Sequence, residues 1–178
     1  MAGDTMHEDL CFGSQHGVFC LRSAAIICHR NHILLSQGER DDFWVLPGGR
    51  VKSFETCSSS LEREVSEETG FRVKAERLVW IVESFYEYRA ERYHEVTFYF
   101  KASPSPQMVQ HMPHTVVRQD TPQAGPRLTL RWHDLCELSH VDINPTFLST
   151  ALSNVPDTLT HVVLVNGVPH DTGVYPRL

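Results

Sequence analysis

Short apolar runs separated by polar turns dominate the first part of the chain. Runs at 23–28 and 33–36 flank the polar residues 29–32, a pattern that predicts a β-hairpin. Residues 43–46 form a third apolar run, and Pro47 with the two glycines behind it ends that run. We therefore expect three short strands before position 47.

A helix is predicted from Glu55 to Thr69. The segment contains no glycine or proline and is rich in residues that favour helices. Ser53 or Thr56 can cap its start, and Gly70 stands where a glycine commonly ends a helix. This is the longest helix that the sequence indicates.

Strand patterns resume after this helix. The remaining expected elements are strands at 78–88 and 95–101 joined by a turn at 88–94, a strand at 127–132, a short helix at 145–152 and a strand at 162–165. Pro145 would occupy the first turn of the short helix. The alternation of strands and helices predicts a single α/β (α+β) domain with a mixed β-sheet.

The chain divides into three parts. Residues 1–17 are polar and are expected to form an N-terminal arm or a short edge element, and residues 18–155 form the domain. Within the domain, five prolines between 103 and 126 predict an irregular insertion. Residues 156–178 are expected to hold a C-terminal strand and a tail.

Charge restricts the choice of partner. The chain has 178 residues and a formal net charge of −6, so it lacks the basic surface that attracts nucleic-acid backbone. Long DNA or RNA is therefore a poor candidate, whereas a small phosphorylated ligand stays acceptable if metal ions screen the charge. The N-terminus has no apolar core, and no apolar run is long enough for a membrane helix. We expect a cytoplasmic protein that makes no membrane contact.

The five cysteines are odd in number, and their spacing matches no disulfide or zinc pattern. Free thiols in a reducing compartment are the expectation. The eleven histidines are scattered and show no metal-ligand spacing.

The predicted helix carries the residues that suggest chemistry. Glu64, Glu67 and Glu68 stand at i, i+3 and i+4, so their carboxylates project from one side of the helix and repel one another. A solvated acidic face is the common explanation for such a helix. Here a glycine turn at 48–49 precedes it, and a hard divalent cation with oxygen ligands would compensate the charge. A strand, a glycine turn and a carboxylate-bearing helix form a plausible cradle for a metal–pyrophosphate complex.

The segment resembles the signature of the Nudix hydrolase (MutT-like) family. That signature is fully matched, with no departure, by Gly49, Glu55, Arg63, Glu64, Val65, Glu67, Glu68, Gly70 and Phe71. The resemblance extends to the order of elements from about position 22 to position 152, but leaves the insertion and both termini unaccounted for. It implies an α/β/α sandwich and a Mg²⁺-dependent pyrophosphohydrolase, with Mn²⁺ as an alternative ion.

The resemblance also implies roles for individual residues. Glu64, Glu67 and Glu68 would bind the ions together with the Gly48 carbonyl. Arg63 and Glu55 would hold the loop and helix together by charged hydrogen bonds.

The proton acceptor is left open by the sequence. Glu95, at the expected start of a strand, could act as general base on the attacking water. A solvent-facing charge explains the position of Glu95 equally well. Glu83 is a weaker candidate for the general base, and a glutamate of the signature could also serve.

The resemblance implies that the substrate is a nucleoside diphosphate derivative or a nucleoside triphosphate, and no second motif selects one. Aromatic residues could stack on its base, although strand aromatics more often belong to the core; the candidates are Phe43, Trp44, Phe85, Tyr86 and Tyr88, with His94 as a further contact. A domain that senses a nucleotide without turnover is the alternative, and the complete set of carboxylates disfavours it. The sequence leaves a homodimer open.

Overall fold

The computed structural model describes residues 8–112, 114–118 and 127–170. Ten strands lie in this part of the chain: β1 (Cys11–Ser14), β2 (Gly17–His29), β3 (His32–Gly38), β4 (Gly48–Arg50), β5 (Val73–Tyr88), β6 (Glu91–Pro104), β7 (Thr115–Arg118), β8 (Leu128–Asp134), β9 (Thr160–Val165) and β10 (Val168–Pro169). The helices are α1 (Cys57–Thr69), α2 (Pro106–His111) and α3 (Leu148–Ala151), with 3-10 turns η1 (Leu135–His140) and η2 (Leu152–Asn154).

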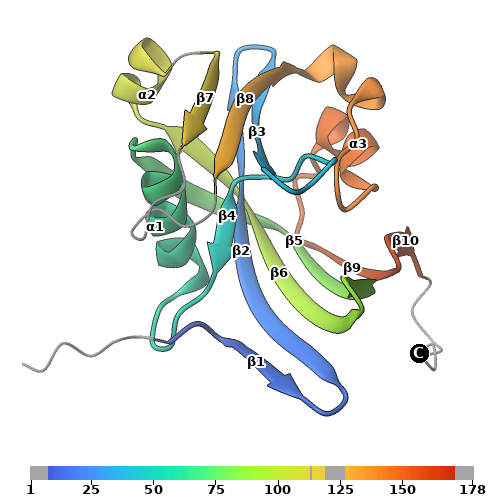
Figure 1. Cartoon of the computed structure of the whole chain (residues 1–178). Helices are drawn as coiled ribbons and strands as arrows, with labels where there is room; N and C mark the ends of the chain where they lie inside the picture. Colours follow the sequence, from blue (N-terminus) through green and yellow to red (C-terminus); the bar gives the residue numbers. More distant parts are fainter. Residues whose placement is uncertain (1–7, 113, 119–126, 171–178) are drawn as a thin grey trace, which may run out of the picture.

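The described strands form one mixed sheet, as the sequence predicts (Figure 1). Its order is β10-β9-β5-β6-β2-β3-β8-β7, and β1 and β4 also pair with β2. The pairs β2–β6 and β5–β9 are parallel, whereas the hairpins are antiparallel. The long central strand β2 therefore pairs with β1, β3, β4 and β6, and its pairing with β4 defines the position of the glycine turn.

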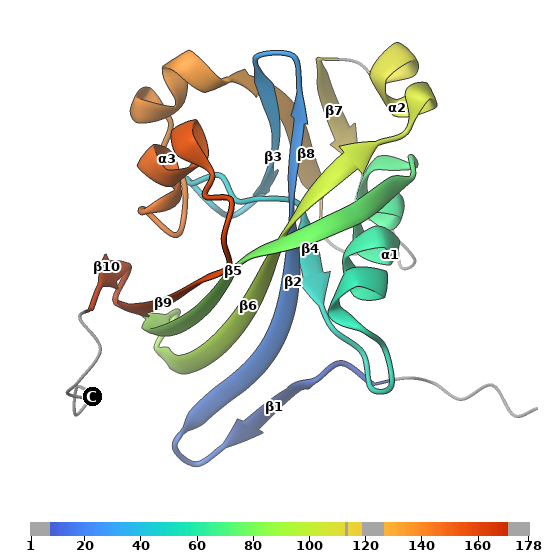
Figure 2. The ribbon, with the colours of Figure 1, turned by 180° about the vertical axis from the view of Figure 1, so that it is seen from behind.

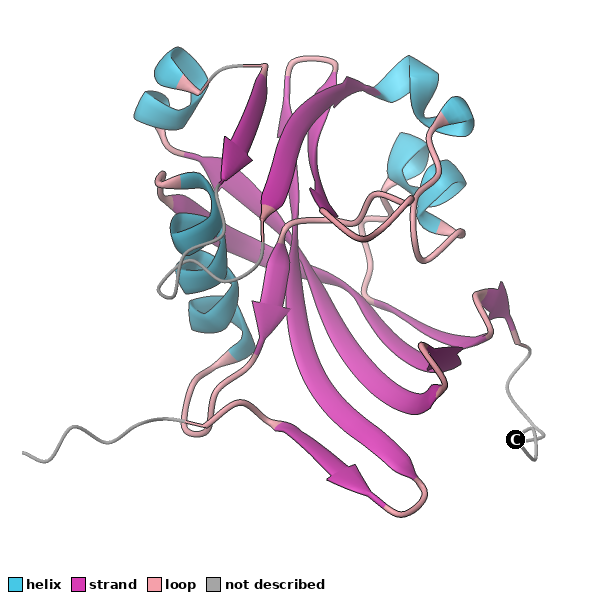
Figure 3. Ribbon diagram, viewed as in Figure 1, coloured by secondary structure: helices cyan, strands magenta, loops and turns pink. Residues whose placement is uncertain are grey.

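Helices cover both faces of the sheet. Successive residues of a strand point to opposite faces, and Ala25 and Ile27 of β2 lie in one buried cluster with Leu61 and Val65 of α1. Their neighbours along β2 lie in a second cluster with residues of η1, α3 and η2. Figures 1 and 2 show α1 and α3 on opposite sides of the sheet, and Figure 3 shows the strands between them. The α/β/α sandwich is confirmed.

The hairpin around β5 and β6 is longer than predicted. Its strands run to Tyr88 and from Glu91, so the connection consists of Arg89 and Ala90 alone. Both residues have positive φ, at 52° and 64°. Glycine or asparagine usually occupies such a two-residue turn, and their absence explains why the sequence suggested a wider one.

The strand predicted at 43–46 is wrong. The backbone of Val45 pairs with Ser36 on β3, whereas that of Trp44 pairs with Ile143, so the two residues form isolated bridges to different partners. The regular strand β4 begins at Gly48 instead, beside Ala24 of β2. The glycines expected to stop a strand are therefore part of one.

The insertion predicted at 103–126 is not irregular in its described part. Residues 113 and 119–126 lie outside the described residues, but α2 and β7 form the rest. Ser105 caps α2 through Met108 N, and Pro106 lies in its first turn. Met108 is fully buried and anchors α2 to the core that α1 also covers. Proline thus marks a helix start here.

The C-terminal helix is shorter than predicted. Pro145 precedes α3, whose first backbone hydrogen bond runs from Leu148 N to the Pro145 carbonyl oxygen at 3.0 Å. The backbone before Pro145 is instead engaged with Trp44, because Asn144 N donates to the Trp44 oxygen. None of the described helices has the length and apolar character needed to cross a membrane.

The expectation that all cysteines are free is wrong for one pair. The strand β1 lies in the predicted N-terminal arm and pairs with β2 of the domain, and this register places Cys11 opposite Cys20 with their Cα atoms 4.0 Å apart. The two form a disulfide, whereas Cys28, Cys57 and Cys136 are free. The register of an edge strand was not readable from spacing alone.

We predict that Leu61→Ala destabilises the protein by about 3 kcal/mol, because it leaves a cavity between α1 and the sheet. Leu61 is fully buried. Urea unfolding should show a lower midpoint with an unchanged slope. Leu159, which is 54% exposed, offers a matched control, since Leu159→Ala should change stability by less than about 0.5 kcal/mol. Equal effects of the two substitutions would contradict the packing described here.

Candidate active site

The helix that carries the glutamates is defined at both ends by its sequence. The Thr56 hydroxyl accepts a hydrogen bond from Ser59 N at 3.1 Å, which satisfies one of the free amides at the start of α1. At the other end Gly70 has a φ of 78°, in the left-handed region, and its N–H donates to the Ser66 oxygen. The predicted helix is confirmed, and its start at Cys57 follows from the Thr56 cap.

Arg63 joins the helix to the loop before it. Its Nε and Nη2 donate to the two oxygens of Glu55, each at 2.9 Å, and Nη2 also donates to the Arg50 oxygen at 3.1 Å. Its Nη1 lies 2.7 Å from Glu64 Oε1 and 3.3 Å from Glu67 Oε2. The Arg63 hydrogen bonds lower the pKa of Glu55. One guanidinium therefore holds three carboxylates, including the expected pair with Glu55.

The glycine turn allows close approach of the helix to the sheet. A Cβ atom on Gly48, whose φ is 149°, would overlap the Ser23 oxygen of β2. A Cβ on Gly49 would overlap the carboxylate of Glu64. At Gly48 the clash is with backbone, so glycine is needed there, whereas a Cβ at Gly49 would displace the Glu64 carboxylate. The Glu64 carboxylate is consequently packed against backbone, and burial raises its pKa.

Glu68 lies deepest in the group. Burial, followed by repulsion from Glu64, raises its pKa to about 8, although attraction to Arg22 and a hydrogen bond from the Gly48 backbone act in the opposite direction. Its Oε2 is buried and has no hydrogen-bond partner. A buried acceptor without a donor is costly, so this atom is suited to a positively charged ligand.

Arg22 was missed by sequence reasoning. It lies on β2 beside β4 and β6, where its Nη1 is 3.7 Å from Glu95 Oε2. Attraction to Glu95, and more weakly to Glu68, raises the Arg22 pKa. The predicted strand began at Ser23, so the alternation along β2 did not extend to this residue. Arg22 is therefore a second cation, after Arg63, and it lies between the glutamates of α1 and the Glu95 carboxylate.

Glu95 is held in a defined position on β6. Its Oε2 accepts a hydrogen bond from the Tyr86 hydroxyl at 3.0 Å, and its Oε1 accepts one from Thr97 Oγ1 at 3.0 Å. Its side chain is only 15% exposed. The structure therefore excludes the solvent-facing charge considered above, and it places Glu95 on the side of the sheet where Arg22 approaches the glutamates of α1.

Several other candidates point away from this group. Glu83 pairs with Val96, which follows Glu95 on β6, so the Glu83 side chain lies on the face of the sheet opposite to Glu95. There its Oε1 is 3.0 Å from His161 Nε2. His94 stacks on Phe85 on that same opposite face, with ring centroids 4.4 Å apart. Glu83, His94 and Phe85 are therefore not part of the candidate site.

The remaining aromatic candidates fall into two groups. Trp44 packs against the core and meets His133 edge-on at 4.5 Å. The Tyr88 hydroxyl donates to Asp41 at 2.7 Å. Tyr86 instead stacks on Tyr93 in nearly parallel rings 5.1 Å apart, on the face that carries Glu95. Of the predicted base-stacking residues, Tyr86 is best placed.

The donor set suits a hard divalent cation. Glu64 and Glu68 offer carboxylate oxygens at the edge of buried surface, and Glu68 Oε2 lacks a donor. Among the residues that the structure describes, no three acidic, histidine or cysteine side chains are already grouped as ligands. Arg63 binds Glu64 and Glu67. The unpaired oxygen of Glu68 and the neighbouring carboxylates nevertheless fit a divalent ion in their chemistry.

Comparisons with known proteins agree with this arrangement. The NUDIX domain family matches residues 21–147. The chain is 35% identical over 65 residues to an 8-oxo-dGTP diphosphatase of Buchnera aphidicola subsp. Schizaphis graminum (strain Sg), an alignment that covers 34% of this chain and 50% of that protein. The chain thus spans about half the length of this curated relative.

Solved structures share the fold at low identity. A MutT protein from Bacillus halodurans is 21% identical with a TM-score of 0.60, over 82% of this chain and 89% of that one. A Nudix hydrolase from Nitrosomonas europaea is 14% identical with a TM-score of 0.55, over 93% and 97%. An ADP-ribose pyrophosphatase from Streptococcus suis is 18% identical with a TM-score of 0.54, over 82% and 98%. Because the family match spans well over half of its length and includes the glycine turn and α1, the chain belongs to the Nudix family.

Proposed function

We propose that this protein hydrolyses a phosphoanhydride bond in a nucleoside diphosphate derivative or a nucleoside triphosphate, with Mg²⁺ or Mn²⁺ as cofactor. The observation that carries the proposal is the unpaired, buried Glu68 Oε2 in a group of carboxylates next to a glycine turn. Costly arrangements of like charge are typical of functional sites.

The proposed division of roles follows the contacts. Glu64, Glu67 and Glu68, with the Gly48 carbonyl, would hold the divalent ion, whereas Arg63 and Glu55 position the loop. When bound, such an ion offsets charge on phosphate oxygens and lowers the pKa of water. Arg22, whose side chain is 38% exposed, can contact a substrate phosphate from the sheet side.

Glu95 is our proposed general base. Each of its oxygens accepts one hydrogen bond from a neighbouring hydroxyl, and a carboxylate oxygen has two acceptor sites, so capacity remains for a water molecule. The carboxylates of α1 would be occupied by the cation and would be weaker bases. Tyr86 and Thr97 would aim Glu95, so that its proton transfer occurs in a fixed geometry.

A small nucleotide is the proposed substrate class. The net charge of −6 disfavours long nucleic acid, and the stacked rings of Tyr86 and Tyr93 offer a face for a base beside Glu95. The relatives act on different molecules, since one is named for 8-oxo-dGTP and another for ADP-ribose. A screen of nucleoside triphosphates, nucleotide sugars and ADP-ribose, with identification of the products, would select among them.

Activity found in that screen should disappear with a chelator and return with Mg²⁺ or Mn²⁺, because the carboxylates need a cation to accept a phosphate group. The measurement is product release in metal-free buffer before and after each ion is added. Full turnover in metal-free buffer would show that the proposed mechanism is wrong.

Glu68→Gln and Glu64→Gln should each reduce kcat by about a hundredfold or more, as removal of a charge-stabilising group commonly does. Each change relieves repulsion, so the melting temperature should not fall. Glu87→Gln serves as the control, because Glu87 is exposed on β5. Near-normal kcat for either variant at saturating metal would remove that residue from the proposed ligand set.

Glu55→Gln should lower stability at neutral pH and lose this effect in acid. The folded-state pKa of Glu55 is depressed by Arg63, so its contribution is present above the unfolded pKa of about 4.3 and is lost as pH falls through the folded value. Unfolding free energies of variant and wild type should therefore converge below about pH 4. A difference that is constant with pH would mean that the charge of Glu55 is not involved.

Glu95→Gln should lower kcat by roughly 10²–10⁴-fold if Glu95 is the general base, with metal affinity nearly unchanged. Tyr86→Phe, which removes only the aiming hydroxyl, should give a smaller loss of kcat at an unchanged melting temperature. Reduced metal affinity of Glu95→Gln would recast Glu95 as a ligand. A rate within about threefold of wild type would assign the base to a glutamate of α1.

A further inference from the structure

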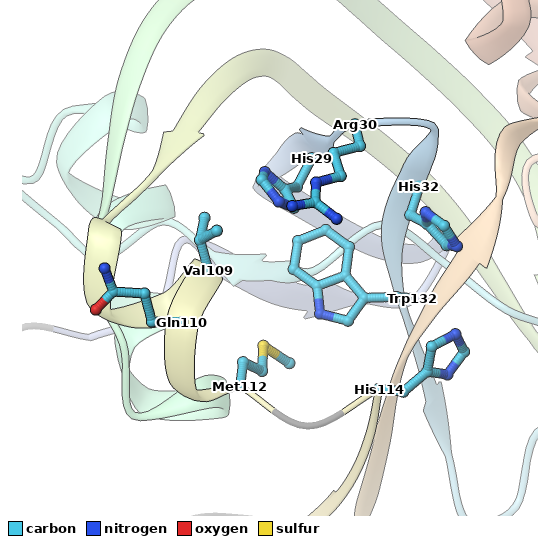
Figure 4. Close-up of a pocket in the computed structure, with 8 residues that line it drawn as sticks. All are labelled: His29, Arg30, His32, Val109, Gln110, Met112, His114 and Trp132. Atoms are coloured by element: carbon cyan, nitrogen blue, oxygen red, sulfur yellow. The ribbon is translucent and has the colours of Figure 1, made fainter.

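A cavity lies at the far end of the sheet from the glutamates. It has a volume of about 500 Å³ and is lined by His29, Arg30, His32, Val109, Gln110, Met112, His114 and Trp132 (Figure 4). Its walls come from the β2–β3 hairpin, β8, α2 and the segment before β7. Along β2, His29 is five residues beyond Ala24, the partner of Gly48, which is roughly 17 Å at strand spacing. The cavity is thus separate from the candidate active site.

The chemistry of this cavity differs from that of the protein as a whole. The chain carries a net charge of −6, yet the lining has one guanidinium, three imidazoles and no carboxylate. Asp134 lies opposite His32 in the β3–β8 register, but its Oδ1 already accepts hydrogen bonds from Asn31 Nδ2 at 2.6 Å and Cys136 N at 2.9 Å. The lining itself contributes the Arg30 guanidinium and the imidazole N–H groups, which are suited to bind an anion.

The lining also offers an aromatic and apolar wall. The His29 and Trp132 rings lie 6.5 Å apart, and the His32 and His114 rings lie 6.1 Å apart on the other side of the indole. Met112 and Trp132 are each 8% exposed and belong to the core cluster that includes Val65 of α1. A floor of this kind, with polar groups at the rim, is typical of small-molecule sites, and 500 Å³ is within their usual range.

We propose that this cavity is an accessory binding site for a small anion that carries an aromatic ring, such as a nucleoside monophosphate. Arg30 and the imidazoles would bind the anionic group, and the ring would lie against the Trp132 and Met112 wall. The residues at the end of α2 and His114 would then have a function of their own, since they line one side of the cavity. This inference does not depend on the proposed hydrolysis.

The test uses adenosine 5′-monophosphate, which contains no anhydride bond for the proposed hydrolase to cleave. It is titrated into isotope-labelled full-length protein, and NMR follows the Trp132 indole N–H together with the amides of Gly48 and Gly49. Inorganic phosphate and adenosine are titrated separately. We expect the monophosphate to shift the Trp132 signal and to bind more tightly than either part.

The variants are chosen to keep the fold. Arg30 has a φ of 53°, so Arg30→Asn removes the charge with a residue that tolerates this conformation. Arg30→Asn and His114→Ala should each weaken the binding seen at Trp132, with about a tenfold loss for Arg30→Asn. Arg92→Asn is the matched control, because Arg92 is exposed on β6, outside the cavity lining.

Three results would overturn the proposal. The first is a shift at Gly48 and Gly49 without one at Trp132, which would place nucleotide binding only at the glutamates. The second is equal affinity for adenosine and its monophosphate, which would remove the anionic requirement. The third is equal binding by Arg30→Asn and Arg92→Asn. Loss of hydrolytic activity is not among these results, so the two proposals fail separately.

Discussion

Repulsion among carboxylates on one side of α1 is the constraint on which the site depends. Glu64, Glu67 and Glu68 lie within two helical turns, and Glu55 is drawn to the same place by Arg63. A single guanidinium compensates three of these four groups, and Glu68 is left with a raised pKa and an unpaired oxygen. The protein alone therefore compensates this charge only in part. A bound cation would supply the remainder.

The rest of the fold serves to hold this charge in place. Leu61 and Val65 fix α1 on the sheet, and the missing Cβ of Gly49 leaves room for the Glu64 carboxylate to lie against the backbone. Across the sheet, Arg22 and Glu95 add an ion pair between neighbouring strands. A rigid core on both faces thus restrains the mutual distances of like charges that would otherwise separate.

The sequence predicted the helix and its glutamates well because local rules decide them: spacing, the Thr56 cap and Gly70. The predictions from sequence failed where the structure of a segment depends on contacts with residues far away in the chain. Val45 and Trp44 pair with different segments, so an apolar run did not become a strand. The sheet register brings Arg22 next to Glu95 and Cys11 next to Cys20. Met108 is buried by residues that are distant in the sequence. Glu95 could be proposed from its strand position, but only the structure supplied Tyr86 and Thr97 as its hydrogen-bond donors.

The proposed cation site on α1 can be tested directly. Direct binding of Mn²⁺, followed by the loss of its free-ion EPR signal, tests this without any substrate. We predict saturable binding to the wild-type protein, with Glu64→Gln and Glu68→Gln binding at least about tenfold more weakly and Glu87→Gln binding normally. Equal binding by all four proteins, or no binding at millimolar Mn²⁺, would contradict the account.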